Sequence, residues 1–320
     1  MEIIESSRAR LRVVRTQTIG VADRPAIFSI DGPGAVDCLQ GLLTNDVVKP
    51  GPGSLVYGAF LTPKGAVIVD CWLIRTADSI LIVVDSAGRE RTAGLLRRQL
   101  PPRLARVTDR SDALAVLWLL GPHECGGLAT LFGGFPPPGR VATLDRDSGP
   151  WLLATGPRSA PFSALVLLPV EAVSVARGDL EAAGVGHGTM ADLRIARVVA
   201  GVPTLGSEID DRTFPQEVDF DRLEGVSYSK GCYVGQETVA RIHFRGHPNW
   251  LLRGVRAEAG WEPVDEILAA GKPVARLGSL VRLENGDIIG LASVRREVVP
   301  GTRIGIDGRL LVSELPQEVT

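Results

Sequence analysis

Two stretches rich in proline and glycine divide this chain into blocks that we expect to fold largely separately. Residues 50–53 read PGPG, and residues 132–139 read FGGFPPPG. Proline cannot continue a helix or a central strand, and clusters of proline and glycine mark turns and loops. With 320 residues, the chain is long enough for about two domains of roughly 150 residues each. We therefore expect boundaries near both stretches and two or three domains.

The blocks before the second boundary combine strands with a few helices. The first 25 residues show no clear period, but a helix is expected over 35–43, after a short strand. Strands rich in valine and isoleucine are expected at 55–61, 66–74, 80–85 and 113–120. Ser86 can cap a helix that runs to about residue 100. This order of elements predicts an α+β module.

The rest of the chain continues the α+β pattern and then changes to strands alone. A helix should begin after Thr189, because Asp192 three residues later completes a capping box, and Gly201 should end it. Beyond Asn249 we expect short strands joined by tight turns, at 251–257, 275–283, 288–295 and 303–312. The Asn285-Gly286 pair is a strong hairpin signal. The C-terminal block is therefore predicted to be a small all-β barrel.

Composition excludes several classes of protein. The net charge is −2, which argues against a broad surface for nucleic acid and leaves room only for a local basic patch. No apolar run reaches the ~20 residues needed to cross a bilayer, and the acidic first five residues do not resemble a signal peptide. Four cysteines far apart in the sequence do not form a disulfide framework. We therefore expect a protein of the reducing cytoplasm, without a membrane partner.

One of the four cysteines lies in unusual surroundings. Cys232 has glycine on one side, Gly235 shortly after it, and Lys230 two residues before it. Glycines allow tight backbone conformations and the close approach of a ligand, and a nearby cation favours the thiolate. We therefore expect a functional thiol at Cys232. The other three are expected to be small core residues, namely Cys38, Cys71 and Cys125.

The segment around Cys232 resembles a known family. Residues 230–237 read KGCYVGQE and are followed by Arg241, which is similar to the signature K-G-C-[FY]-x-G-Q-E-x-x-x-R of YgfZ-type folate-binding proteins. These proteins are relatives of the glycine cleavage T-protein, an aminomethyltransferase. The resemblance covers nearly the whole chain, with further matching stretches at 30–46, 61–65, 194–203, 215–217 and 290–292.

The resemblance implies a fold and a role. The fold would be a three-domain T-protein-like ring around a central channel, with two α+β domains and a C-terminal small β-barrel. The expected domains are 1–48 with 140–245, which would bind folate, then 49–139, and then the barrel at 246–320. Tetrahydrofolate would bind in the channel, and the protein would support iron–sulfur cluster assembly or repair, and tRNA modification through iron–sulfur enzymes. Its partners would be folate and iron–sulfur proteins or assembly factors, with no direct nucleic acid, and it would be a monomer.

The expected site residues fall into two groups. A pterin ring carries adjacent N–H donors, which a carboxylate such as Glu217 can accept in bidentate fashion, and arginine suits the anionic tail of folate. The folate-binding group comprises Asn45, Glu217, Tyr228, Gln236, Glu237 and Arg241. The catalytic group comprises Cys232, Lys230 and Asp70.

Two departures from T-proteins weigh against an enzyme. Val199 stands where T-proteins carry a glutamate, and it cannot accept a hydrogen bond from a pterin. Only Asp70 remains of a pair of aspartates, since Val69 precedes it. T-proteins also lack the cysteine signature. The alternative, a folate-dependent aminomethyltransferase or related one-carbon transfer enzyme, would use Asp70 as its acid and base.

Two other kinds of site fit the sequence less well. Cys232, His243 and His247 could hold zinc, but both histidines would have to lie on one helical turn, and residues 244–248 favour no helix. A cysteine nucleophile with His187 as base lacks a third group to orient it. We therefore expect no metal site. Neither a dinucleotide-binding G-x-G-x-x-G nor a P-loop lysine is found.

Overall fold

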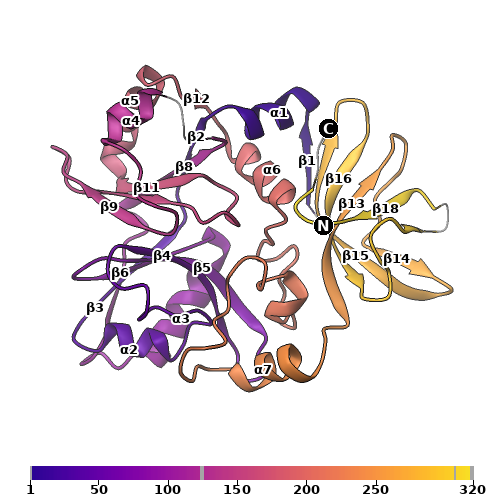
Figure 1. Cartoon of the computed structure of the whole chain (residues 1–320), viewed down its shortest axis with the longest axis horizontal. Helices are drawn as coiled ribbons and strands as arrows, with labels where there is room; N and C mark the ends of the chain where they lie inside the picture. The colour runs from indigo at the N-terminus through magenta and orange to yellow at the C-terminus, as the bar shows by residue number, and fades with distance from the viewer. Residues whose placement is uncertain (1, 123–125, 306–307, 318–320) are drawn as a thin grey trace.

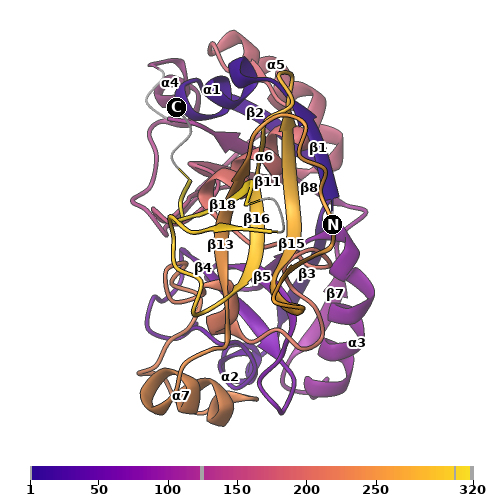
Figure 2. The same cartoon turned by 90° about the vertical axis from the view of Figure 1, so that its right-hand side faces the viewer.

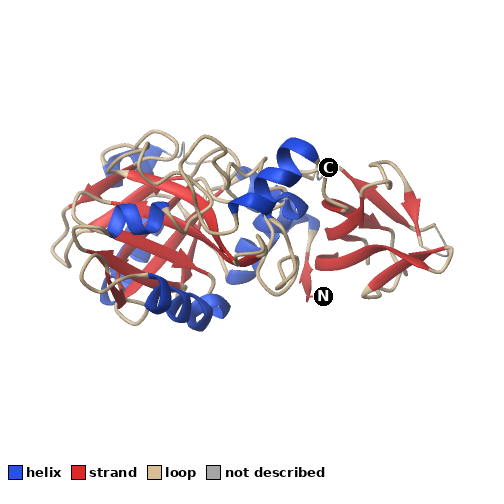
Figure 3. Ribbon diagram, turned by 90° about the horizontal axis from the view of Figure 1, so that it is seen from below, coloured by secondary structure: helices blue, strands red, loops and turns tan. Residues whose placement is uncertain are grey.

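The computed structural model describes residues 2–122, 126–305 and 308–317, and shows three β-sheets joined by helices (Figure 1). Two of the sheets lie together in one part of the molecule, and the third forms a separate lobe. Figure 3 shows helices between these two parts. None of the described helices is long and apolar enough to cross a membrane.

The first sheet has five antiparallel strands and two covering helices. In spatial order the strands are β4 (Ser54–Leu61), β5 (Val67–Arg75), β6 (Ile80–Val84), β3 (Ala26–Asp31) and β7 (Arg106–Asp109). The helices are α2 (Ala35–Gln40) and α3 (Arg89–Gln99), with a 3-10 turn, η1 (Ser86–Gly88), before α3. Leu39 and Leu96 bury their side chains against strand residues such as Phe28. The strands predicted at 55–61, 66–74 and 80–85 are confirmed, and the helix predicted over 35–43 is shorter.

The second sheet has six strands. Their order is β12 (Gly186–His187), β2 (Ile19–Asp23), β8 (Leu114–Leu120), β11 (Ala164–Pro169), β10 (Trp151–Thr155) and β9 (Val141–Leu144). Beside it lie α4 (Gly126–Phe132), η2 (Val170–Ala172) and α5 (Val173–Ala182). Figure 1 shows α4 and α5 together at one end of this sheet.

The third sheet combines both ends of the chain. Its order is β1 (Glu2–Ser6), β15 (Lys272–Leu283), β16 (Ile288–Arg295), β13 (Trp250–Ala257), β18 (Leu310–Ser313) and β17 (Arg303–Ile304), with β14 (Glu266–Ala269) paired to β15. Within the described strands β1 and β17 end this path and do not pair, so the predicted closed barrel is not found. Figure 2 shows β15, β16 and β13 side by side on this face. β1 pairs in parallel with β15, which gives structure to a segment where the sequence showed no period.

Two helices lie between the third sheet and the other two. They are α1 (Arg8–Thr16) and α6 (Met190–Ala200), and α6 contacts strands of the second and third sheets. The predicted capping box of Thr189 and Asp192 is confirmed at the start of α6, and Gly201 ends the helix in the left-handed region, with φ 70°. Arg10 of α1 forms a bidentate ion pair with Asp192, which joins the two helices.

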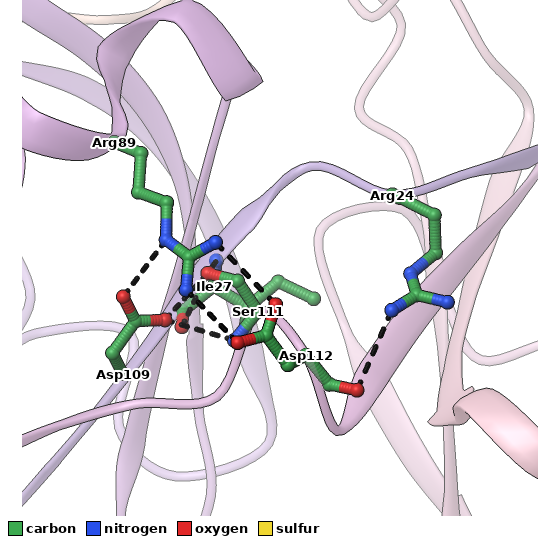
Figure 4. Close-up of polar contacts among 6 residues, drawn as sticks. All are labelled: Arg24, Ile27, Arg89, Asp109, Ser111 and Asp112. Carbon is green, nitrogen blue, oxygen red and sulfur yellow. Dashed lines mark hydrogen bonds and ion pairs between the residues drawn. The ribbon is translucent and has the colours of Figure 1, made fainter.

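The first two sheets are interleaved along the chain. Residues 24–25 lead from β2 to β3, and residues 110–113 lead from β7 back to β8. Ser111, in the second connection, contacts both β3 and β7, since its Oγ accepts from Ile27 N at 3.0 Å and donates to Asp109 Oδ1 at 2.6 Å (Figure 4). Arg89 forms an ion pair with Asp109 beside Ser111. The strands of residues 49–139 therefore fall in two sheets, and the division into domains stays a prediction.

A largely irregular segment completes the chain between α6 and β13. It contains the 3-10 turn η3 (Pro215–Val218) and one helix, α7 (Gln236–Arg245). Figures 1 and 2 place α7 and α2 at the same end of the molecule.

Candidate functional site

The three sheets and α6 meet around a central cavity of about 250 Å³. Each sheet contributes side chains to its wall. They include Asp70 and Trp72 from the first sheet, Asp23 and Trp118 from the second, Ile4 and Ser279 from the third, and Leu193, Arg194 and Arg197 from α6. A pocket at such a junction, with apolar walls and a few polar groups, is typical of a small-molecule site.

Aromatic rings form one side of the cavity. Trp72 and Trp118 each lie 4.9 Å from the ring of Phe162, measured between ring centroids. The ring centroid of Tyr57 lies 4.9 Å from that of Trp72. These rings pack against each other in tilted and edge-on orientations, which fixes the wall and offers flat apolar surfaces.

Asp70 is a carboxyl group inside this apolar wall. It accepts a hydrogen bond of 2.9 Å from the hydroxyl of Tyr57. Burial raises the pKa of Asp70 above its ordinary value, and the positive charge of Arg197 and the Tyr57 bond offset only part of that effect. Burial also raises the pKa of Tyr57 well above its ordinary value, and the nearby charge of Asp70 adds to this effect. Asp70 can therefore hold a proton at a higher pH than an exposed aspartate.

Asp23 is a second carboxyl group lining the cavity. Its two oxygens accept from Trp118 Nε1 at 2.9 Å and from Arg24 N at 2.7 Å. Burial raises its pKa as well. Asp23 and Asp70 thus bring carboxyl groups from two different sheets to the cavity, where they can accept hydrogen bonds from a ligand, and Asp85 is a third carboxyl group in the lining.

Arg197 supplies positive charge in the cavity. Its Nη1 lies 3.7 Å from Asp85 Oδ2 and 3.4 Å from Thr204 Oγ1. Sequence reasoning missed Arg197, Asp23 and Asp85 as site residues. For Arg197 there was a signal, since it follows Leu193 by four residues on the buried face of a predicted helix, where an arginine is uncommon.

Glu208 fixes the wall where the third sheet meets the cavity. It is buried, and its two oxygens accept from Thr204 N at 2.8 Å and from Ser279 N at 2.6 Å. The second bond fills an irregularity in the pairing of β15 with β16. Any side chain at Gly278 would collide with this carboxylate, since a Cβ there would lie 2.2 Å from Oε1.

Of the residues predicted from sequence, only Asp70 lines the central cavity. Lys230 is 8% exposed, and its Nζ donates to the carbonyls of Gln40, Leu43 and Asn45 at 2.6, 2.7 and 2.9 Å. Burial lowers its pKa to about 8. All three N–H groups of the ammonium are used at the end of α2, so none remains for the thiol of Cys232.

The three cysteines that the structure describes differ in their exposure. Cys232 is exposed, whereas Cys71 is buried and Cys38 is half-buried against the core of the first sheet. Burial raises the pKa of the Cys71 thiol well above its ordinary value. Cys125 lies outside the described residues.

The other predicted folate ligands are spread over two further places. The Asn45 amide donates to the carbonyls of Tyr57 and Glu224, at 2.8 and 2.6 Å. Gln236 accepts from Tyr233 N at the start of α7. Asn45 and Tyr228 line an open groove, and Glu237 and Arg241 are exposed on α7.

Glu217 lies in another pocket, of about 250 Å³, beside Trp250 and Arg276. It accepts from Phe214 N at 3.0 Å, and burial raises its pKa. The structure therefore does not bring Glu217 into one pocket with Asp70.

The histidines that a zinc site or a cysteine nucleophile would need, His187, His243 and His247, are all exposed. Among the described residues, no group of three or more His, Cys, Asp or Glu side chains is placed to hold a metal ion. α7 ends at Arg245, so His243 and His247 do not share a helical turn. His187 is exposed and lies 3.3 Å from Glu181.

Comparisons with known proteins agree with the resemblance seen in the sequence. The GCVT N-terminal domain family matches residues 8–134. An aminomethyltransferase from Rubrobacter xylanophilus is 32% identical over 253 residues, which are 73% of this chain and 65% of that protein. The tRNA-modifying protein YgfZ of Klebsiella pneumoniae is 26% identical over 322 residues, which are 97% of this chain and 95% of that protein.

The fold also has a solved counterpart. The glycine cleavage system aminomethyltransferase T of Bartonella henselae superposes with a TM-score of 0.76, covering 96% of this chain and 88% of that chain, at 18% identity. The likeness to the YgfZ proteins extends over nearly the full length, whereas the chain spans about two thirds of the Rubrobacter protein. The chain is therefore similar to the GCVT N-terminal domain over residues 8–134 and to YgfZ proteins over nearly its whole length.

Proposed function

We propose that this chain is a tetrahydrofolate-binding protein of the YgfZ type that supports iron–sulfur cluster assembly or repair, and tRNA modification through iron–sulfur enzymes. The observation that carries the folate part is the central cavity, with Asp70 set into a wall of aromatic rings. We also propose that it is a monomer in the cytoplasm.

The residues of the cavity fit a folate. A pterin is a flat ring with hydrogen-bond donors at its edge, so it needs apolar faces and carboxylate acceptors. Trp72, Trp118 and Phe162 offer the faces, and Asp70 and Asp23 offer the acceptors. The tail of folate is anionic, and Arg194 and Arg197 of α6 are the cations that line the same cavity.

Within that cavity each residue would have a defined part. Tetrahydrofolate, when bound, supplies a carrier for one-carbon units. Asp70 would accept donors of the ring, with its orientation set by the Tyr57 hydroxyl. Arg197 would hold the carboxylates of the ligand in place of its present contact with Asp85. Glu208 would keep the opposite wall in place through Ser279.

The iron–sulfur part of the proposal rests on Cys232. The signature around it resembles that of YgfZ-type proteins, and its thiol is exposed on the surface rather than in the cavity. A partner protein can therefore reach the thiol while folate occupies the cavity. We expect Cys232→Ala to abolish rescue of iron–sulfur enzyme activity in a deletion strain, with folate affinity unchanged. Full rescue by this variant would rule out the role of the thiol.

One observation favours a second function. Burial raises the pKa of Asp70, so this carboxyl group can take and return a proton at a higher pH than an exposed aspartate, as suits an acid–base group. A folate-dependent aminomethyltransferase would use such a group. Incubation with tetrahydrofolate and an aminomethyl donor tests this directly, because turnover that disappears in Asp70→Asn would establish the enzyme, and no turnover by wild type would exclude it.

A further inference from the structure

One side of α7 faces away from the rest of the molecule. It consists of Glu237, Arg241, Phe244 and Arg245, which are spaced i, i+4, i+7 and i+8 along the helix and are all exposed. Val239, which is buried, lies on the opposite side of the helix. We call these four exposed residues the outer face of α7. None of them lines the central cavity, so folate binding there does not use them.

Phe244 is the aromatic residue of the outer face. It is 67% exposed, which is the largest exposed fraction among the large hydrophobic side chains described. Its ring stands edge-on to the rings of Tyr228 and His243, at 5.8 and 4.7 Å between centroids. The Tyr228 hydroxyl is held in turn by Asp221 and by the buried Gln216. An exposed ring with fixed neighbours is suited to anchor a protein partner, because docking then costs little side-chain entropy.

The two arginines of the outer face are available to a partner. Arg241 and Arg245 are exposed and form no ion pair with any residue that the structure describes. Asp221 and Glu224 line the groove on the other side of α7, together with His243. Arginine is enriched at protein interfaces, and its planar guanidinium can pair with a carboxylate through two hydrogen bonds. The outer face therefore fits carboxylates on a partner.

Cys232 lies close to the outer face. It precedes the first residue of α7 by four residues, which span at most about 14 Å, and Phe244 lies about 12 Å further along the helix. The chain is fixed on both sides of the thiol, because Lys230 donates to carbonyls at the end of α2 and Val234 N donates to Gly41 O at 3.1 Å. A standard interface buries about 800 Å² on each partner, a patch about 30 Å across. One partner can therefore cover both the thiol and Phe244.

We propose that Cys232 and the outer face of α7 form one docking surface for a protein whose contact surface is acidic and has an apolar pocket. This inference rests on the role proposed for the Cys232 thiol, and it says how the partner of that thiol binds. Phe244 would enter the pocket, and Arg241 and Arg245 would pair with carboxylates. Glu237 favours a protein over a phosphate chain or an anionic membrane, because it would repel both, whereas a protein can place a cation opposite it.

Photocross-linking from Cys232 tests this proposal. The purified full chain is labelled at Cys232 with benzophenone maleimide, added to an extract of a deletion strain and irradiated. Adducts are detected with an antibody against the chain, and Cys232→Ala treated in the same way sets the background. We expect an adduct with a different protein. The adduct supports the proposal only if its yield depends on the outer face of α7.

Variants of the outer face supply that dependence. Phe244→Ala should lower the adduct yield roughly 30-fold, which is the affinity lost at a hot-spot residue. Arg241→Glu with Arg245→Glu should lower it at least about tenfold, because like charges would then meet across the interface. Arg97→Glu with Arg98→Glu, an exposed pair in the last turn of α3, makes the same change of charge and is the matched control. It should leave the yield unchanged.

Rescue of iron–sulfur enzyme activity in the deletion strain separates this inference from the proposed function. Phe244→Ala should lose rescue, and the Arg97→Glu with Arg98→Glu control should keep it. If wild type does not rescue, the iron–sulfur role is wrong, and the adduct yields still decide whether the docking surface exists.

Four results would overturn the docking surface. They are no adduct above the Cys232→Ala background, equal yields from Phe244→Ala and wild type, an adduct of twice the 34.0 kDa mass of the chain, which would make a second copy the occupant, and loss of the adduct on nuclease treatment. Unchanged thermal unfolding of Phe244→Ala serves as the check on folding, since this side chain is mostly exposed.

Discussion

Lys230 makes contacts that its place in the motif does not reveal. Its position before Cys232 suggested a cation that favours the thiolate. In the structure its ammonium is buried and donates to three carbonyls at the end of α2. We infer that Lys230 positions the cysteine segment by tying it to α2.

Replacing Lys230 tests this positioning role. Lys230→Met keeps the length of the side chain and removes every donor, so it should lower the free energy of unfolding by about 1.5–3 kcal/mol, the usual cost of losing bonds to a charged group. Urea unfolding measures the change. Lys64→Met, in an exposed turn, is the matched control and should have little effect. If both variants unfold alike, Lys230 does not anchor the segment.

Asp70 carries a pH-dependent cost for stability. Its pKa is raised in the folded protein above the ordinary value of 3.8. Below pH 3.8 the Asp70 carboxyl group is mostly protonated in both the folded and the unfolded protein. As pH rises toward the folded pKa, the unfolded chain loses its proton first, so stability falls, and the full penalty applies above the folded pKa. Asparagine carries no such penalty and can still accept from Tyr57.

The Asp70→Asn variant should therefore be more stable than wild type near neutral pH. We expect a gain of about 0.5–2 kcal/mol, the range common for single stabilising substitutions. The gain should shrink at about pH 4. Urea unfolding at both pH values measures it, with the exposed Asp78→Asn as control. A less stable Asp70→Asn at pH 7 would contradict the direction of the pKa shift.

At the scale of elements, local patterns predicted most of the helices and strands. β16 (Ile288–Arg295) has the predicted bounds, and the capping box of Thr189 with Asp192 is formed. β1 could not be predicted, because its partner β15 lies at the far end of the chain. The barrel was predicted from the number of short strands, but strand spacing does not determine whether a sheet closes.

Ser111 lies where the chain passes between the first two sheets, and we expect its small side chain to contribute strongly to the free energy of unfolding. Ser111→Ala leaves Ile27 N without its acceptor in a buried place, which should cost about 1–3 kcal/mol of unfolding free energy. Asp112→Ala is the control from the same cluster, because that side chain is 88% exposed, and its change should stay within about 0.5 kcal/mol. Thermal unfolding of both variants decides whether the connections of Figure 4 depend on Ser111.

Glu208 is a second single residue on which local structure depends, because it accepts from the backbone of β15 where the pairing with β16 is irregular. Glu208→Gln can accept only one of the two backbone N–H groups that the carboxylate now accepts. We expect a loss of about 1–3 kcal/mol in unfolding free energy and weaker folate binding, because Ser279 lines the cavity. Glu266→Gln, on the exposed strand β14, is the control. Unchanged stability of Glu208→Gln would show that the bulge does not need the carboxylate.

At the scale of the whole molecule, the cavity is built from parts that no local pattern connects. Asp23, Asp70, Arg197 and Ser279 come from different elements and meet only when three sheets pack around α6. The sequence pointed instead to residues close to Cys232 along the chain. The structure spreads those residues over the end of α2, the open groove lined by Asn45 and Tyr228, and the pocket of Glu217. Motifs pointed to the relatives that the comparisons also find, while the central cavity is seen only in the tertiary structure.

The placement of folate in the central cavity is the central claim, and one comparison of variants tests it most directly. Tetrahydrofolate is titrated by calorimetry against wild type, Asp70→Asn and Glu217→Gln, which alter single carboxylates in two separate pockets. We predict one site per chain, with affinity weakened roughly tenfold to 100-fold by Asp70→Asn, as expected for a bond to a charged group, and unchanged by Glu217→Gln. Loss of binding in Glu217→Gln with normal binding in Asp70→Asn would contradict the claim and place folate in the pocket beside Trp250.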